Sequence, residues 1–354
     1  ALGHEDMVDR HLWQAEAVLT EKNIIFQPCA EARRHLCRLP GAQQVGLFPG
    51  ATVEGVFAIW YGKAPGLDRS MDPLRHANLA GTNPKGGTLL LVGDDHGAKS
   101  STVACSSDGN FAALGMPLLA PANAQEVLDF GLHGIALSRY SSTLVGLKLV
   151  TDVVEGGGSV HVSPDSPRIA LPEKTVKHPG ITHFTPILEQ ERLLWDVKQR
   201  LVLDYIRAND LNRISGADDA TIGIVAAGKA WQDLEQALAG MGYAQGRING
   251  AKVRLLKIGA IWPLDDRIVR AFAQGLEAII VVEEKRPMIE DQIRAQLYGS
   301  GLSPRIVGKH FAANGDTAFP NYGEIDPGLI TRVLARVANE MDPACGIALP
   351  NSTG

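Results

Sequence analysis

Paired cysteines, long apolar runs and an excess of positive charge are all missing from this chain of 354 residues. Its four cysteines include no C-x-x-C pair, which excludes a four-cysteine zinc or iron–sulfur site built from this chain alone. No apolar run approaches the roughly 18 residues of a membrane-spanning helix, and no secretion signal is visible at the N-terminus. A net charge of −5 is unlike that of proteins that bind nucleic acids or membrane surfaces. We therefore expect a cytoplasmic protein with free thiols.

The length predicts two domains. We expect both to be α/β domains with doubly wound parallel sheets, since strands and helices alternate along the second of them. Hydrophobic residues make up 45% of the chain and charged residues 21%, as in ordinary globular proteins. Residues 156–184 are rich in Pro, Ser and Gly and have no periodicity, so they are expected to be a linker. The domains are then residues 1–155 and 185–354.

Hydrophobic periodicity and turn residues predict the elements of each domain. In the first domain we expect helices at 4–22, 31–44 (interrupted at Pro40-Gly41), 73–80 and 123–140, and strands at 24–26, 53–60, 89–92, 117–120 and 144–154. Asn123 and Glu126 form a predicted capping box. In the second domain we expect strands at 222–226, 253–258, 278–282 and 305–307, and helices at 187–206, 230–241, 265–276, 288–297 and 327–340.

The stretch 86–101 is the part of the chain that most resembles a functional site. Its apolar strand ends at Gly93 and is followed directly by carboxylates, a histidine, a lysine and hydroxyls. Open α/β folds bind ligands at the carboxyl ends of such strands. The stretch nearly fits a phosphate-binding loop, but Ala98 replaces the last glycine, and Asp94 and Asp95 put negative charge where an anion would lie. A polar turn after a core strand is the other interpretation.

Residues 55–101 closely resemble the indolepyruvate ferredoxin oxidoreductases, particularly the long fused bacterial form. The resemblance continues through 117–141 and returns at 221–238, 254–264 and 281–293. It implies a thiamine diphosphate (TPP) enzyme that decarboxylates aryl-pyruvates, passes electrons through iron–sulfur clusters to ferredoxin, and releases a coenzyme A thioester. The first domain then covers the aminopyrimidine half of TPP, and the second resembles the transketolase C-terminal domain.

The resemblance also implies that other domains or subunits complete the enzyme. The G-D-G turn and later asparagine that hold the diphosphate and Mg²⁺ in thiamine enzymes are not visible in the sequence. The cluster cysteines are absent too. We expect the N-terminal portion of a larger polypeptide, or a subunit with TPP-binding and iron–sulfur partners, that forms homo- or hetero-oligomers. Ala1-Leu2-Gly3 resembles the middle of the family's opening glycine-rich motif, so a first strand is expected to precede it.

Thiamine chemistry needs a carboxylate on the pyrimidine ring, and Glu31 is the candidate. Ungapped matching places the family glutamate at Ala32, one position later. One residue along a helix turns a side chain by about 100°. Either Glu31 serves after a local shift, or the carboxylate is lost.

The resemblance assigns further roles by position. His96 and Lys99 are expected to act beside Glu31 near the substrate carboxylate, and the cofactor-binding set is Asp94, Asp95, Ser100 and Ser101. The expected substrate-binding residues are Lys63, Arg69, Arg75 and His76, since arginine suits a carboxylate. A purely structural interpretation, in which these groups cap the following helix and one another, stays open.

Cys105 and Ser106 stand where the family usually has histidine and glutamine. Together with Ala32, these departures support an alternative hypothesis. The chain would then be a degenerate, non-catalytic paralogue that acts as a structural or interaction subunit.

Overall fold

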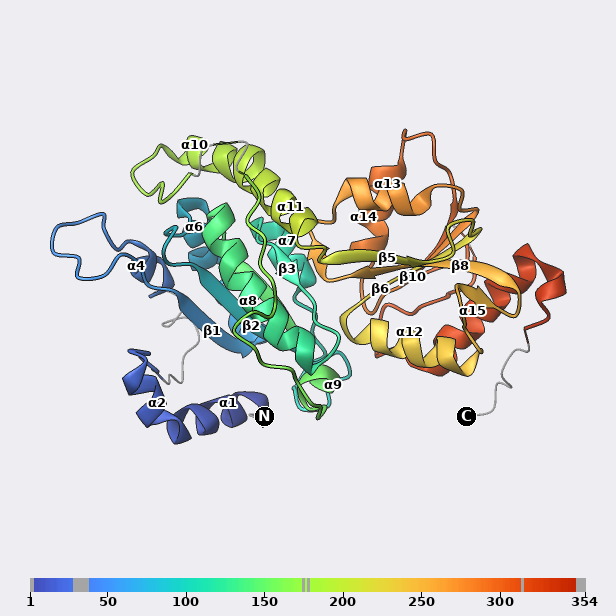
Figure 1. Ribbon diagram of the computed structural model, residues 1–354, viewed down its shortest axis with the longest axis horizontal. Coiled ribbons are helices and arrows are strands. Elements are labelled where there is room, and N and C mark those ends of the chain that lie inside the picture. The colour runs from blue at the N-terminus through green and yellow to red at the C-terminus, as the bar shows by residue number, and fades with distance from the viewer. Residues whose placement is uncertain (1–2, 28–37, 174–175, 177–178, 313–314, 348–354) are drawn as a thin grey trace. The chain divides into compact units, whose positions relative to one another are not determined.

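The computed structural model describes residues 3–27, 38–173, 176, 179–312 and 315–347 (Figure 1). The chain divides into two compact units. Unit 1 comprises Ala1–Leu118, Gly131–Thr151 and Glu173–Val202, and unit 2 comprises Leu119–Phe130, Asp152–Pro172 and Leu203–Gly354. None of the helices within the described ranges is long and apolar enough to cross a bilayer.

This division differs from the expected boundaries at 155 and 185, because a helix predicted to follow the linker is bonded to unit 1 and part of the predicted linker is bonded to unit 2. Lys198 is buried and its Nζ donates to the carbonyls of Asn78 and Leu79, at 2.9 and 3.0 Å. The helix expected at 187–206 was predicted to begin the second domain, but these bonds attach it to unit 1. The side chain of Asn209 exchanges two hydrogen bonds with the backbone of Ala170, which joins the 152–172 segment to unit 2.

The sheet of unit 1 contains strands β1 (Ala58–Lys63), β2 (Thr88–Asp94), β4 (Val145–Val150) and β3 (Leu118–Leu119), side by side in that order. The pairs β1–β2 and β2–β4 are parallel. The helices that begin or lie in this part of the chain are α1 (Gly3–Gln14), α2 (Glu16–Glu21), α4 (Leu39–Gln43), α5 (Ala64–Asp68), α6 (Met71–Ala80), α7 (Asp108–Leu114), α8 (Ala124–Ser141), α9 (Thr151–Val154), α10 (Ile187–Arg192), a π-helix (Leu193–Lys198) and α11 (Gln199–Ala208).

Several expectations for unit 1 were wrong in detail. Residues 24–26 form no strand, and Ile25 is 83% exposed, so its β propensity finds no partner strand. The expected strand 53–60 begins only at Ala58, and α5 occupies a stretch for which no helix was predicted. The strand predicted for 144–154 ends at Val150, where α9 follows. Helix α4 begins at Leu39 with Pro40 in its first turn, and most of the earlier part of the helix expected at 31–44 lies outside the described residues.

The sheet of unit 2 has the order β11 (Arg305–Val307), β10 (Ala278–Val282), β6 (Ile222–Ala227), β8 (Ala251–Ile258) and β5 (Asn212–Gly216). All neighbours are parallel except β5, which pairs antiparallel with β8. The other elements are β7 (Arg247–Ile248), β9 (Ala260–Trp262), α12 (Gly228–Gly240), α13 (Asp266–Ala273), α14 (Met288–Leu297), α15 (Pro327–Met341) and a 3₁₀-helix (Pro343–Cys345). The predicted α/β class and parallel sheets are confirmed.

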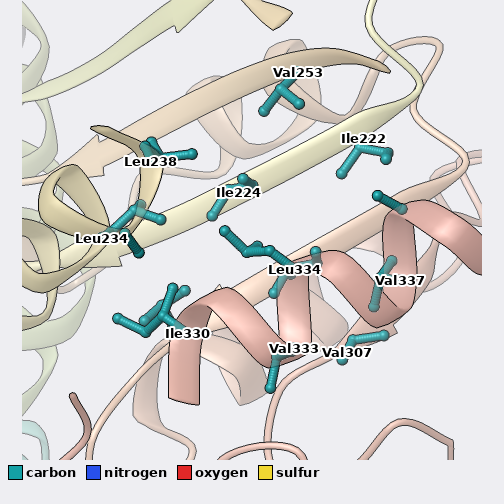
Figure 2. Close-up of a cluster of buried hydrophobic side chains, with 14 of the residues drawn as sticks. Ile222, Ile224, Leu234, Leu238, Val253, Val307, Ile330, Val333, Leu334 and Val337 are labelled. Carbon is teal, nitrogen blue, oxygen red and sulfur yellow. The ribbon is translucent and has the colours of Figure 1, made fainter. Parts of the chain in front are cut away.

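The core of unit 2 lies between its sheet and two helices, α12 and α15 (Figure 2). Ile222 and Ile224 of β6 meet Leu234 of α12 and Leu334 of α15. Strand β6 is buried along almost its whole length, as expected for a central parallel strand with helices on both faces. The side chain of Asp326 caps α15 by accepting from the amide of Leu329 at 2.8 Å, as its position before a proline predicts.

Candidate functional site

The candidate site lies at the carboxyl end of the unit 1 sheet. Strand β2 ends at Asp94, and the loop 95–107 leads from it to α7. In the parallel register Lys63, the last residue of β1, pairs with Gly93, and Asp94 pairs with Val150, the last residue of β4. The polar groups predicted after β2 therefore share an edge with the end of β1. This is the edge at which α/β sheets place ligands.

Asp95 organises the loop that follows β2. Its carboxylate accepts hydrogen bonds from the backbone amides of Lys99, Ser100 and Ser101, each at 2.8 Å. Ala98 has a φ of +53°, in the left-handed region, which turns these successive amides toward one point. The near-fit to a phosphate-binding loop thus has a physical basis. The loop does form an anion-binding concavity, but the anion is its own Asp95, so these amides do not fit a diphosphate.

The environment of Asp95 favours its ionised form. Burial by itself would raise the pKa of this carboxyl, but the hydrogen bonds from the amides of Ser100, Lys99 and Ser101 outweigh burial and lower the pKa to about 2. Asp95 is therefore ionised at all physiological pH values. Its charge is satisfied within the loop.

Replacing Asp95 by asparagine is expected to lower the free energy of unfolding at pH 7 by about 1.5–3 kcal/mol, as for hydrogen bonds to a charged acceptor. The low pKa of Asp95 stabilises the fold fully above about pH 4, and this contribution is lost as pH falls toward 2. The difference in the free energy of unfolding between wild type and variant, measured by urea titration, should therefore become smaller toward pH 2. Asp72→Asn, at an exposed position on α6, is the matched control. A gap that stays constant with pH would contradict this role.

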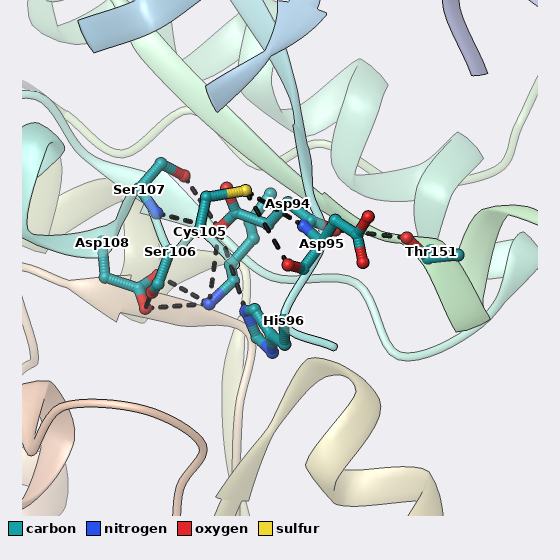
Figure 3. A network of polar contacts seen from close by, with 9 residues as sticks. Asp94, Asp95, His96, Cys105, Ser106, Ser107, Asp108 and Thr151 are labelled. Atoms are coloured by element: carbon teal, nitrogen blue, oxygen red, sulfur yellow. Dashed lines mark hydrogen bonds and ion pairs between the residues drawn. The ribbon is translucent and has the colours of Figure 1, made fainter. Parts of the chain in front are cut away.

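Asp94 is buried at the end of β2, and its carboxyl group accepts hydrogen bonds through Oδ2 (Figure 3). Its Oδ2 accepts from the amide and the hydroxyl of Ser107, at 2.9 and 3.0 Å. Among the described residues, its Oδ1 has no hydrogen-bond partner. Burial raises the pKa of Asp94, Lys148 opposes that rise, and Asp108 adds to it. The adjacent carboxyls of Asp94 and Asp95 therefore have pKa values shifted in opposite directions.

Lys148 of β4 and Asp108 of α7 form a close ion pair near Asp94. Lys148 Nζ lies 2.8 Å from both carboxylate oxygens of Asp108 and 3.8 Å from Oδ2 of Asp94. The Ser106 hydroxyl donates to Asp108 at 2.7 Å. Burial would raise the pKa of Asp108, but the charge and hydrogen bonds of Lys148 lower it overall. Asp108 is thus the ionised partner of Lys148.

His96 and Cys105 complete the wall of this cluster. The imidazole of His96 is buried, with Nε2 4.0 Å from Oδ2 of Asp94. The Cys105 sulfur accepts from the amide of Asp95 at 3.3 Å. Burial, together with the nearby charges of Asp94 and Asp95, raises the pKa of the Cys105 thiol, so it stays protonated and is a poor nucleophile.

The other predicted site residues are distributed unevenly. Lys99 and Arg69 are exposed, and Lys63 is half-buried at the end of β1. Arg75 donates to the carbonyl of Ala113 at 3.0 Å, and His76 faces Asp72 at 3.8 Å on the exposed side of α6. No contact between these two side chains and the 94–101 loop is seen within the described residues. Glu31 lies outside the described residues, so its proposed role stays a prediction.

Lys148, Asp108 and Ser107 were not predicted from the sequence. Lys148 is the single charged residue among the apolar residues 144–150 of an expected strand. A lysine in an apolar strand is rarely buried without a partner. That signal pointed to a buried carboxylate, but it could not identify Asp108.

Three comparisons with known proteins agree with this architecture. A family model described as "Indolepyruvate oxidoreductase domain" matches residues 212–345. The indolepyruvate oxidoreductase subunit IorA of Methanothermobacter thermautotrophicus is 29% identical over 268 residues, 73% of this chain and 40% of that protein. IorA of Pyrococcus abyssi is 26% identical over 272 residues, 73% of this chain and 39% of that protein. The chain thus spans less than half the length of these curated relatives.

Two solved structures share the fold. One is the 2-oxoglutarate:ferredoxin oxidoreductase of Magnetococcus marinus, solved with 2-oxoglutarate, coenzyme A and succinyl-CoA bound. The match covers 96% of this chain and 61% of the chain of that structure. The TM-score is 0.66 at 15% identity. A split-gene transketolase, described as an inactive beta4 tetramer, has a TM-score of 0.54 at 12% identity, over 89% of this chain and 84% of its own. Residues 212–345 therefore match the indolepyruvate oxidoreductase domain, and the chain is similar in sequence to the IorA subunits.

Proposed function

We propose that this chain is part of a TPP-dependent oxidoreductase that decarboxylates 2-oxoacids of the aryl-pyruvate type. The enzyme would transfer electrons through iron–sulfur clusters to ferredoxin and form an acyl-coenzyme A. The observation that carries the proposal is the ordered polar edge of unit 1, where loop 95–107 follows the central strand β2. In this role unit 1 covers the pyrimidine side of TPP and unit 2 is the transketolase C-terminal-like domain.

The candidate residues divide into three groups under this proposal. Lys63, Lys99, Arg69, Arg75 and His76 would attract and bind the substrate carboxylate, since their side chains carry or can carry positive charge. Glu31 and His96 would act in proton transfer, and Asp94, Asp95, Ser100 and Ser101 would shape the cofactor side of the cleft. When bound, TPP supplies the carbanion chemistry of decarboxylation.

The diphosphate and its Mg²⁺ would be held by another domain or subunit. The amides of Lys99, Ser100 and Ser101 are occupied by Asp95, so the one anion-binding loop identified in the described part of unit 1 does not fit a diphosphate. The working enzyme is then a cytoplasmic oligomer with TPP-binding and iron–sulfur partners. We expect isothermal titration of the 354-residue chain with TPP and Mg²⁺ to give no binding at micromolar concentrations. Micromolar affinity would contradict this location.

Activity is tested in the assembled enzyme, with indolepyruvate, TPP, Mg²⁺ and coenzyme A, by following reduction of a viologen dye. Oxoacid-dependent reduction that needs this chain supports the proposal. Reduction that continues when the chain is omitted contradicts it. Glu31→Gln in the same assay decides whether Glu31 is the pyrimidine carboxylate, because unchanged turnover would remove it from the mechanism.

The degenerate paralogue is the second candidate, and the site gives it one specific support. The Cys105 sulfur accepts a hydrogen bond from the amide of Asp95, and the Ser106 hydroxyl donates one to Asp108 at the start of α7. They would then serve only to hold the loop. An assembled complex that forms but shows no oxoacid-dependent reduction would favour this alternative.

A further inference from the structure

The buried cluster of Asp94, Asp108 and Lys148 has one cation for two carboxyl groups. All three side chains are nearly or fully inaccessible, with Asp94 at 0%, Lys148 at 10% and Asp108 at 12% exposure. An unpaired buried carboxylate is costly, and in practice such a group takes up a proton instead. One of the two carboxyls is therefore expected to be neutral.

The geometry distinguishes the two. Asp108 receives Lys148 on both oxygens at 2.8 Å and the Ser106 hydroxyl at 2.7 Å. Asp94 lies 3.8 Å from Lys148, beyond hydrogen-bond distance. Its Oδ2 is the acceptor for Ser107, so a proton on this carboxyl belongs on Oδ1, which has no partner among the described residues. Asp108 fits the ionised form and Asp94 the neutral one.

The titratable groups that face Asp94 come from three elements. Lys148 comes from β4, Asp108 from the start of α7, and His96 and Cys105 from the intervening loop. Ser107 and Thr151 supply uncharged contacts, the first to the carboxylate and the second to the carbonyl of Asp94. Lys148 lies closer to Asp108, at 2.8 Å from each carboxylate oxygen, than to Asp94, at 3.8 Å.

We propose that Asp94 is protonated because Asp108 acts as a positioning residue that binds Lys148 closely through both carboxylate oxygens, so that neither acidic residue after β2 repels an anionic substrate. The charge of Asp95 is satisfied by the loop amides, and the Lys148–Asp108 pair is neutral as a unit. Neither of the two aspartates that follow one another at the end of β2 then adds an uncompensated negative charge near Lys63 and Lys99. The assignment of the anion as a 2-oxoacid carboxylate rests on the proposed function. The protonation of Asp94 does not.

The test compares Asp94→Asn with Asp108→Asn in the full chain. Asparagine imitates a neutral carboxyl, so Asp94→Asn should leave the urea midpoint at pH 7 close to that of wild type. Asp108→Asn should lower it by about 1 M or more, since it removes the partner of a buried lysine. Wild type should lose stability relative to Asp94→Asn as pH rises, because a group whose pKa is raised on folding stabilises the fold only while protonated. Equal losses for both variants at pH 7 would overturn the proposal.

Infrared spectroscopy gives a second readout that does not depend on the stability of any variant other than Asp94→Asn. Wild type at pH 7 should show the carbonyl band of a protonated carboxyl, and Asp94→Asn should lack it. Lys148→Arg, which keeps the cation, should retain the band. Absence of the band in wild type would refute the protonated state. Neither measurement uses an oxoacid, so a negative result here would leave the proposed enzyme activity standing.

Discussion

Replacing Lys148 by methionine is expected to destabilise unit 1 by about 3–5 kcal/mol, the usual cost of removing one partner of a buried ion pair. The variant leaves the carboxylate of Asp108, bonded to Lys148 through both oxygens, without its cation. Hydrogen exchange resolved by peptides is the suitable measurement, because it separates β2, β4 and α7 from unit 2. We expect protection in these three elements to fall together.

Lys85→Met is the control for this experiment. Lys85 lies in unit 1 but is largely exposed, and its pairing with Glu54 at 3.8 Å is on the surface. Such pairs contribute about 0–1 kcal/mol, so this variant should behave almost as wild type. If Lys148→Met cost no more than Lys85→Met, the buried cluster would not contribute to the stability of unit 1.

Replacing Lys229 by methionine is expected to have an effect of similar size, about 3–5 kcal/mol, on unit 2. Lys229 is in the first turn of α12, and its Nζ lies 2.8 Å from Asp233 and 3.2 Å from Glu284 at the end of β10. It also donates to the carbonyl of Ile325 at 2.6 Å, just before α15. One ammonium group thus joins three segments, and its loss leaves buried carboxylates uncompensated.

The expected signature is loss of hydrogen-exchange protection in α12, β10 and the start of α15, with unit 1 unchanged. Lys252→Met is the matched control, because Lys252 is partly exposed and pairs with the exposed Asp219. A cooperative loss of protection across both units would contradict a local role. Protection equal to that of the control would contradict the role altogether.

The sequence predicted the start of a helix correctly where a capping side chain marks it, and it predicted less well where only residue propensity was available. The side chain of Asn123 accepts from the amide of Glu126 at 3.0 Å, and Asp326 caps α15, both as expected from cap residues at fixed spacing. The short apolar segment at 24–26 had only β propensity in its favour, and it formed no strand. Propensity needs a neighbouring strand to become structure, and the sequence does not show where that strand lies.

The candidate site was predicted in outline but not in its charge arrangement. The apolar run before Gly93 located the loop, because a buried strand that ends in polar residues points to a sheet edge. The fold places the two aspartates on different sides of the chain. Asp95 binds the amides of its own loop, whereas Asp94 faces Lys148. Successive residues point to opposite sides. The resemblance treated the two aspartates alike, whereas the fold gives them different partners and pKa values shifted in opposite directions.

The occupation of the loop amides by Asp95 affects the thermodynamics of ligand binding. A phosphate-binding loop often becomes rigid only when its ligand arrives, and the lost conformational freedom then weakens the affinity. Here Asp95 fixes the backbone of residues 99–101 during folding. Any ligand that meets this edge therefore encounters a surface that is already rigid, and its binding should carry a small entropy penalty from this loop. The carboxylate of Asp95 acts as a built-in substitute for a ligand and preorganises the loop in advance.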